Sequence, residues 1–342
     1  MLWQEGSMIV EARTPTRIDL SGGTLDLYPL YLFAGGGITN NAAIDLWSEV
    51  RIETRADSQV RLKSVDTGQE LAACCVAELP VDRELGFVAR VVKFYAPRTG
   101  VDVITNNRPP HGSGLGASSA LLIALSGALD RLNGTGMDPA LFVEYGANLE
   151  AQAIEIPTGK QDYLAALYGG VNAFHFDVRG WEREQLIRDE EKLRAFEERI
   201  VLTFTGETHF SGTSNWNMLK RYIDNAPGSR ENMGRIKQVA QEMREALLAF
   251  DLGRFGELLA REWESRKRLA DGVTTPAIDR MVEAAASAGA AASKICGAGG
   301  GGCMITFVEP GRRKAVEAAL EGAGATLMPF RIAREGLTVK EV

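Results

Sequence analysis

"RPPHGSGLGASSALLIAL", from Arg108 to Leu125, places three glycines and three serines directly in front of an apolar run. The residues from Ala117 to Leu132 have the composition of a buried helix. A glycine-rich entrance to a helix can hold an anion, because unpaired N–H groups and the helix dipole both point at it. It can also be a tight turn in which Ser118 and Ser119 only cap the helix. This stretch alone supports both interpretations equally, so the remainder of the chain has to distinguish them.

Two common nucleotide-binding fingerprints do not fit the loop. Gly112 to Ala117 formally reads G-x-G-x-x-A, which is a weak match when it stands alone. In a dinucleotide-binding fold the first glycine follows a strand directly, near the start of the domain, and an acidic residue follows about 20 positions later. Here Pro109–His111 intervene, a long segment precedes the loop, and no acidic residue ends a second strand about 20 positions later. A Walker A loop is excluded because no Lys–Ser/Thr pair follows the last glycine.

Length and charge limit the class of protein. At 342 residues the chain exceeds what one compact core usually serves, so two domains are expected. A net charge of −7 argues against a nucleic-acid partner or a polybasic membrane contact. The longest apolar run is too short to span a bilayer, and the acidic N-terminus lacks a signal-peptide core. The four cysteines, Cys74, Cys75, Cys296 and Cys303, lack the spacing of a zinc site or a disulfide framework. We expect buried thiols in a cytoplasmic protein.

The patterning along the chain predicts an α+β organisation. The N-terminal third alternates apolar and polar residues, which is typical of strands. A helix is predicted from Pro139 to about Ile154, with Asp138 as N-cap and the proline at the first helical position. Residues 211–270 read as consecutive amphipathic helices, followed by a helix, a strand–loop–strand and another helix. We place the domains at 8–175 and 176–342.

Two further segments are rich in glycine. In "TPTRIDLSGGTLDLYPLY", Arg17 and Asp26 bracket a Gly22–Gly23 turn; the alternative is a surface salt bridge beside a hairpin. In "KICGAGGGGCMITF", Gly297 and Gly299–Gly302 lie between two apolar strands. Five glycines in six positions let the backbone approach a ligand closely, at an entropic cost that a plain hairpin does not require. This pattern favours a functional loop.

Three such segments in this order resemble the GHMP kinases, the superfamily of galactokinase, homoserine kinase, mevalonate kinase and phosphomevalonate kinase. The first motif of the family resembles "PTRIDLSGGTLD", the second resembles Pro110 to Ser119, and the third resembles "KICGAGGGGCM". Two positions of the second motif differ, since Ala117 stands for a serine and Ser119 for an alanine. The stretches "GLGASSAL", "TGKQDYLAALYGGVNAF" and "KICGAGGGG" are most similar to the heptose 7-phosphate kinase and fucose kinase branch.

The resemblance implies a two-domain GHMP kinase fold, with a ribosomal-protein-S5-like N-terminal domain and a ferredoxin-like C-terminal domain with extra helices. It implies Mg²⁺- and ATP-dependent phosphorylation of a sugar or sugar phosphate, at the anomeric hydroxyl, by a monomer or homodimer. One alternative is a kinase of a non-sugar alcohol such as mevalonate or homoserine. Another is a non-catalytic sensor of sugar and ATP on the same fold, and a dinucleotide oxidoreductase is the weakest.

The resemblance also assigns residues to ATP and magnesium. The phosphates are expected on the loop formed by Pro110, Gly112, Ser113, Gly114, Leu115, Gly116, Ala117, Ser118 and Ser119. Ser118 and Glu150 are the expected magnesium ligands. The alternative for Glu150 is a carboxylate that faces water on its helix.

In the family pattern, Asp162 of "GKQD" accepts or orients the proton of the acceptor hydroxyl, and Arg17 lies beside it and the transferring phosphoryl group. The alternative for Asp162 is a helix cap, and Lys160 could touch a substrate phosphate or pair with Glu155. The acceptor is expected to contact the following residues: Asp26, Gly22, Gly23, Lys160, Thr205, His209, Gly299 and Gly300. Thr205 and His209 could equally belong to a plain strand-to-helix loop.

Overall fold

The computed structural model describes residues 7–207 and 211–342, with the backbone alone for 211–214. Its larger sheet has eight strands in the order β12-β1-β2-β5-β3-β4, to which β6 is added beside β2 and β7 beside β6. All pairs are antiparallel except β3 with β5. The strands are β1 (Ile9–Ser21), β2 (Gly37–Thr54), β3 (Val60–Ser64), β4 (Glu70–Ala73), β5 (Val101–Asn107), β6 (Val171–Asp177), β7 (Gly180–Ile187) and β12 (Thr338–Glu341).

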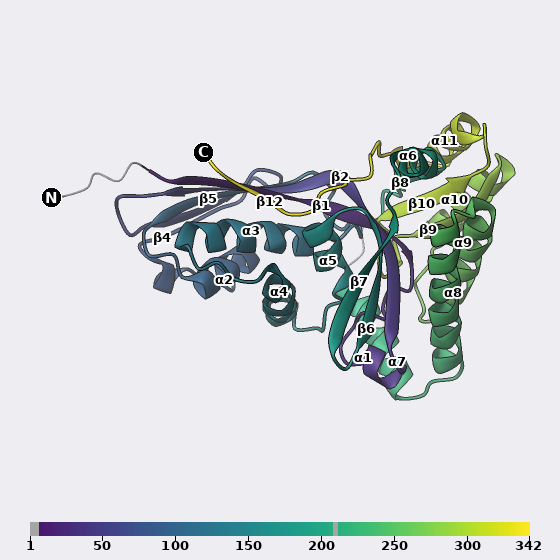
Figure 1. The fold of residues 1–342 in the computed structure, drawn as a ribbon, viewed down its shortest axis with the longest axis horizontal. Helices are drawn as coiled ribbons and strands as arrows, with labels where there is room; N and C mark the ends of the chain where they lie inside the picture. Colours follow the sequence, from purple (N-terminus) through teal and green to yellow (C-terminus); the bar gives the residue numbers. More distant parts are fainter. Residues whose placement is uncertain (1–6, 208–210) are drawn as a thin grey trace.

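Helices cover one face of this sheet. The opposite face is open only in part, because helices of the second domain pack on the region that contains β7 and the end of β1 (Figure 1). The covering helices are α2 (Gly86–Tyr95), α3 (Ala117–Asn133), α4 (Pro139–Ile154) and α5 (Gln161–Tyr168). The prediction for α4 is confirmed, because the Asp138 carboxylate accepts the Ala140 N–H and Pro139 is the first helical residue. Helix α3 is almost entirely apolar and buried, so it forms the centre of this core. Short segments at the edges are α1 (Leu30–Phe33) and the 3-10 helix η1 (Val76–Glu78).

A second sheet of four antiparallel strands has the order β11-β8-β10-β9. With α8 and α9 after β8 and α11 after β10, this is the β-α-β-β-α-β pattern of a ferredoxin-like domain with additional helices. The α+β two-domain prediction is therefore confirmed. The elements are α6 (Glu190–Glu198), β8 (Ile200–Phe204), α7 (Ser211–Ile223), α8 (Ser229–Ala249), α9 (Leu252–Arg266), α10 (Pro276–Ser287), β9 (Ala290–Ile295), β10 (Cys303–Val308), α11 (Arg313–Gly322) and β11 (Thr326–Leu327).

Strand β1 belongs to both hydrophobic cores. Val10 and Ala12 pack with α2–α5, whereas Ile18 and Leu20 pack with the helices and strands of the second sheet. The second half of β1 is consequently buried without alternation, from Thr14 onward. Figure 1 shows β1 and β2 running from the first layer toward β8–β10. Side chains at the end of β1 therefore lie between the two parts of the molecule.

The first sheet extends beyond the expected boundary between 175 and 176. That boundary falls inside β6, and β7 and the C-terminal β12 also pair within the first sheet. The expectation for the cysteines was half wrong, because Cys296 and Cys303 are buried but Cys74 is exposed and Cys75 is partly exposed. In 7–207 and 211–342, no helix has the length and apolar character needed to cross a bilayer.

Candidate active site

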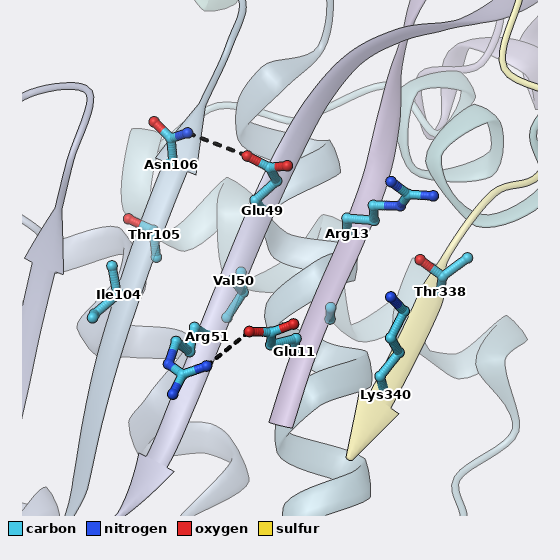
Figure 2. Close-up of a pocket in the computed structure, with 11 residues that line it drawn as sticks. Glu11, Arg13, Glu49, Val50, Arg51, Ile104, Thr105, Asn106, Thr338 and Lys340 are labelled. Atoms are coloured by element: carbon cyan, nitrogen blue, oxygen red, sulfur yellow. Dashed lines mark hydrogen bonds and ion pairs between the residues drawn. The ribbon is translucent and has the colours of Figure 1, made fainter. Parts of the chain in front are cut away.

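A cavity of about 1040 Å³ brings together segments that are far apart in the sequence. Its wall includes the loop 109–119, the turn at Gly23 and Thr24, residues 157–159, the first two residues of α5, and Gly297 with Ala298. The same cavity extends past Ser64–Gln69 to the start of α2. All three glycine-rich segments thus contribute to one site. A smaller hollow lies on the open face of the large sheet, between Glu11, Arg51 and Lys340 (Figure 2).

The loop before α3 has the backbone geometry of an anion cradle. Gly112, Gly114 and Gly116 have φ of 70°, 70° and 75°, a region that glycine adopts without strain. The N-cap of α3 is Gly116, and in the described chain no side chain caps the first turn. The alternative in which both serines only cap the helix is therefore wrong. The amides of the first turn of α3 point toward the cavity end of the helix, where an anion is stabilised.

Two contacts hold this loop in place. The Arg17 N–H on β1 donates to the Leu115 carbonyl at 3.0 Å. On the other side, the Cys303 N–H donates to the Ser113 carbonyl at 2.7 Å. A Cβ at Gly114 would lie 2.7 Å from the Cys296 carbonyl oxygen. The third glycine-rich segment therefore packs directly on the back of the loop.

Oxygen donors gather at the start of α3. The Glu150 carboxylate on α4 is buried and accepts hydrogen bonds from Ser118 Oγ, from Ser119 Oγ at 2.9 Å and from the Tyr163 hydroxyl. The alternative in which Glu150 faces water is therefore wrong. Burial raises the pKa of Glu150 above its ordinary value, and the three hydroxyls oppose that shift. A carboxylate with neighbouring hydroxyl oxygens is the donor type that Mg²⁺ prefers, so Ser118 and Glu150 fit the expected metal.

An ion pair joins the loop to α5. Arg17 Nε donates to Asp162 Oδ1 at 2.7 Å, and its Nη1 donates to the Gly114 carbonyl at 2.5 Å. Asp162 lies in the first turn of α5, whose N-cap is Lys160, so it is not the cap of that helix. Burial raises the pKa of Asp162 above its ordinary value although Arg17 opposes the shift. The Asp162 side chain keeps 22% of its surface exposed, which leaves it accessible from the cavity.

Gly116 explains how closely the loop approaches this carboxylate. A Cβ at Gly116 would lie 2.8 Å from both Cγ and Oδ2 of Asp162. Such a distance is shorter than a van der Waals contact, and the positive φ further excludes other residues. The loop backbone at Gly116 can therefore lie directly against the Asp162 carboxylate only because residue 116 has no side chain.

Asp26 lines the cavity beside the start of α5. Its carboxylate is buried and accepts the Gln161 N–H at 2.9 Å, and a Cβ at Gly159 would lie 2.2 Å from Asp26 Oδ2. Burial raises its pKa to about 6, with the nearby Asp162 adding to the shift. Arg17 pairs with Asp162 and is itself buried, so the alternative of a surface salt bridge between Arg17 and Asp26 is wrong.

Several residues expected at the acceptor do not line the cavity formed by the described chain. The Lys160 ammonium contacts both oxygens of Glu144, each at 2.7 Å, and not Glu155. Gly22 supports the turn from behind, since a Cβ there would lie 2.0 Å from the Ile38 carbonyl oxygen. The Thr205 hydroxyl donates to the Gly302 carbonyl at 2.8 Å.

The two glycines expected from the third segment also point elsewhere. The Gly300 N–H donates to the Val273 carbonyl at 2.7 Å, and a Cβ at Gly299 would lie 2.7 Å from Val273 Cγ1. They anchor the segment, while Gly297 and Ala298 reach the cavity. His209 lies outside the described residues.

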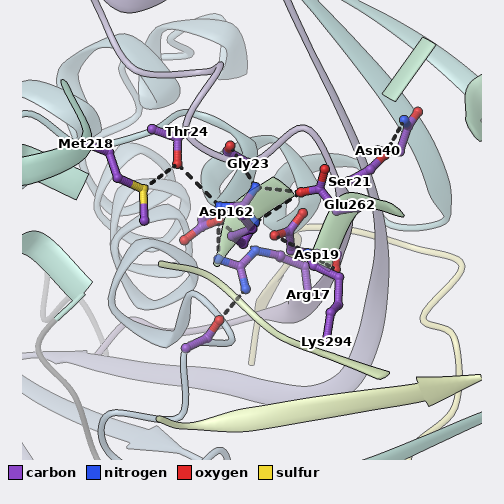
Figure 3. A network of polar contacts seen from close by, with 12 residues as sticks. Arg17, Asp19, Ser21, Gly23, Thr24, Asn40, Asp162, Met218, Glu262 and Lys294 are labelled. Carbon is purple, nitrogen blue, oxygen red and sulfur yellow. Dashed lines mark hydrogen bonds and ion pairs between the residues drawn. The ribbon is translucent and has the colours of Figure 1, made fainter. Parts of the chain in front are cut away.

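The sequence did not reveal the buried charges behind the Gly23 turn (Figure 3). Lys294 Nζ contacts Asp19 Oδ2 at 2.7 Å, and Arg266 Nη2 contacts Glu262 Oε1 at 2.7 Å, with all four side chains fully buried. Tyr163, which contacts Glu150, was missed as well. Charged residues inside otherwise apolar elements, such as Lys294 in "SKIC", were the available signal.

Comparison with known proteins shows the family to which the chain belongs. Residues 84–170 match the family model described as "GHMP kinases N terminal domain", and residues 243–326 match "GHMP kinases C terminal". A mevalonate kinase from Thermococcus onnurineus is 31% identical over 251 residues, covering 71% of this chain and 70% of that protein. The chain belongs to the GHMP kinase family. It is a phosphotransferase with an alcohol group as acceptor, and GHMP kinases use ATP as the phosphate donor.

Two similar proteins span nearly the whole length. D-glycero-alpha-D-manno-heptose 7-phosphate kinase from Campylobacter jejuni is 28% identical over 338 residues, covering 96% of this chain and 98% of the relative. The crystal structure of a D-glycero-D-manno-heptose 1-phosphate kinase from Bacteroides thetaiotaomicron has a TM-score of 0.80 and 26% identity. The superposition covers 97% of this chain and 99% of the chain in that crystal structure.

Proposed function

We propose that the protein transfers the γ-phosphoryl group of ATP, with Mg²⁺, to the anomeric hydroxyl of a sugar or sugar phosphate. The observation that carries the proposal is the position of Asp162, whose carboxylate lies against the phosphate loop at Gly116 and shares a cavity with Asp26. The names of the two heptose kinases support a sugar acceptor. Donor and acceptor would meet where the first domain contacts the second.

The loop 110–119 would hold the phosphates of ATP. Its positive-φ glycines leave the backbone uncovered, and the amides of the first turn of α3 can donate to phosphate oxygens. No Walker lysine is required, because amides and the helix dipole supply the positive potential. Ser118 and Glu150 would hold Mg²⁺, which neutralises charge on the phosphates when bound.

Asp162 and Arg17 would act on the reacting atoms. Asp162 accepts the proton of the acceptor hydroxyl as its oxygen bonds to the γ-phosphorus and ADP departs. Arg17 holds the carboxylate with Nε and the loop with Nη1, so one guanidinium fixes the base relative to the phosphate site. Its charge also opposes the rise in the pKa of Asp162 that burial causes, and so favours the ionised form of the base.

Asp26 would bind sugar hydroxyls. A carboxylate accepts hydrogen bonds from several hydroxyls, and Asp26 lines the same cavity as Asp162. Gly23 and Thr24 line the same end of the cavity. An acceptor that places hydroxyls beside Asp26 and Asp162 matches this set better than one that places an anionic group there, which the two carboxylates would repel.

The second candidate is a kinase of a non-sugar alcohol, favoured by the similarity to a mevalonate kinase. The decisive experiment measures ADP formation with Mg²⁺ over a panel of acceptors. The panel comprises free and phosphorylated heptoses, fucose, galactose, glucuronate, mannose, mevalonate and homoserine, with Asp162→Asn as matched control. Turnover of a sugar by the wild type alone supports the proposal. Turnover of mevalonate or homoserine alone contradicts it, and ATP binding without any turnover indicates a sensor.

A further inference from the structure

The turn at Gly23 and Thr24 is an unusual piece of the cavity wall. Thr24 has a φ of 79°, a left-handed conformation that a β-branched residue rarely adopts. Thr24 nevertheless lines the cavity, two residues before Asp26. A conformation of this kind persists only where the surroundings determine it. The question is which residues hold the turn.

Arg266 contacts this turn from behind. It is the last residue of α9, and its side chain is fully buried. Its Nη2 donates to the Gly23 carbonyl at 2.9 Å, and its Nη1 lies 3.5 Å from Thr24 Oγ1. The other edge of the guanidinium is occupied by Glu262, one turn earlier on the same helix, at 3.0 Å from Nε and 2.7 Å from Nη2.

The buried charged side chains pack tightly against the Gly23–Thr24 turn (Figure 3). A Cβ at Gly23 would lie 2.9 Å from Asp19 Oδ2, 3.1 Å from Arg266 Nη2 and 3.2 Å from Gln161 Nε2. Asp19 is in turn held by Lys294 on β9. The back of the turn therefore rests on a rigid polar surface, to which α9 and β9 of the second domain contribute.

We propose that Arg266 is a positioning residue for the acceptor, acting through the Gly23–Thr24 turn. Glu262 orients the guanidinium, and the guanidinium fixes the Gly23 carbonyl and the Thr24 side chain, so that the turn keeps its place beside Asp26. The α9 helix thereby sets the shape of the acceptor end and leaves the phosphate loop untouched. This inference rests on the proposed function, in which Asp26 binds the acceptor.

Two variants test this role without depending on one fold-sensitive substitution. Arg266→Lys keeps a positive charge but cannot contact Glu262 and the turn with a planar fork. The double variant Arg266→Met/Glu262→Met removes both buried charges together and leaves neither uncompensated, which buried pairs often tolerate. Arg261→Met is the matched control, because Arg261 lies on the same helix, is partly exposed and pairs with Glu242 on α8.

The readouts separate positioning from general destabilisation. KM for the best acceptor of the panel should rise about tenfold or more in the double variant and less in Arg266→Lys, while KM for ATP stays within about twofold. Hydrogen exchange should accelerate in the peptide covering 20–27 and stay unchanged in the peptide covering 112–119. Arg261→Met should behave as wild type in all three measurements.

Unchanged acceptor KM overturns the inference, and so does a rise in exchange that extends equally to 112–119. If wild-type protein turns over no acceptor, the proposed function fails. The exchange experiment, which needs no substrate, then decides by itself whether Arg266 holds the turn.

Discussion

Replacing Asp26 by asparagine should change the pH dependence of stability in a defined direction. Burial raises the pKa of Asp26 from an ordinary 3.8 to about 6. Between these values the folded protein binds a proton that the unfolded chain has released, so stability falls as the pH rises through this window and levels off above pH 6. Two pKa units correspond to about 3 kcal/mol lost at pH 8 through this one carboxylate. Because asparagine does not titrate, the Asp26→Asn variant should not show this loss of stability.

The measurable quantity is the difference between Asp26→Asn and wild type at two pH values. About half of the loss has already occurred at pH 5, so the variant should gain about 1.4 kcal/mol relative to wild type between pH 5 and pH 8. Any fixed cost of placing an amide beside Gly159 cancels in this difference. Urea unfolding at both pH values gives the free energies. Exposed Asp271→Asn serves as the control and should follow the wild type.

The reasoning would be refuted if the free energies of unfolding of Asp26→Asn and wild type differed by the same amount at pH 5 and pH 8. That result would mean that ionising the Asp26 carboxylate costs the folded protein no stability. The same substitution should raise the acceptor KM, since the amide offers fewer acceptor sites to sugar hydroxyls. A gain in stability at the expense of binding is what a strained functional carboxylate predicts.

Three further substitutions test other parts of the site. Asp162→Asn should lower kcat by about 10³-fold and leave ATP affinity within about twofold, measured by steady-state kinetics and calorimetry; near-normal turnover would remove Asp162 from the chemistry. Ser118→Ala should raise the Mg²⁺ concentration needed for half-maximal activity at least several-fold with an unchanged circular dichroism spectrum; an unaltered magnesium titration would contradict its role as ligand. Gly116→Ala should abolish turnover while the chain still folds, because its Cβ would press on the Asp162 carboxylate; wild-type kcat in this variant would show that the loop does not need that close approach.

Local sequence patterns were sufficient to predict the helices that follow the glycine-rich loop 112–116. The Asp138–Pro139 start of α4 and the apolar run of α3 follow from capping and burial, which neighbouring residues determine. The resemblance then supplied pairs that no local pattern contains, such as Arg17 with Asp162, which are 145 positions apart. The domain boundary was harder to predict, since β12 returns to pair with β1 and adds a C-terminal segment to the first sheet.

The pairs that were missed share one physical cause. Asp19 and Lys294 are 275 positions apart, and Gly23 and Arg266 are 243 apart, so only the folded chain shows that the first two compensate each other's charge and that the Gly23 carbonyl accepts from Arg266. From the sequence, a lysine in a strand or an arginine at a helix end is expected to face solvent. Their burial without partners would be prohibitive. Lys294 finds its counterion, Asp19, across the contact between the two domains. Arg266 instead pairs with Glu262 on its own helix and reaches across the contact to the Gly23 carbonyl.

The folded structure also corrects the expected roles of the glycines. All three glycine-rich segments were expected to touch ligands, because glycine permits close approach. The Cβ distances separate two uses of that freedom. At Gly116 the missing side chain makes room for the Asp162 carboxylate, whereas at Gly302 it makes room for the Ser113 and Gly112 carbonyls of the loop itself. The third segment therefore acts mainly as the support that holds the phosphate loop against β1, and a substitution at Gly302 would affect nucleotide binding through the loop rather than by direct contact.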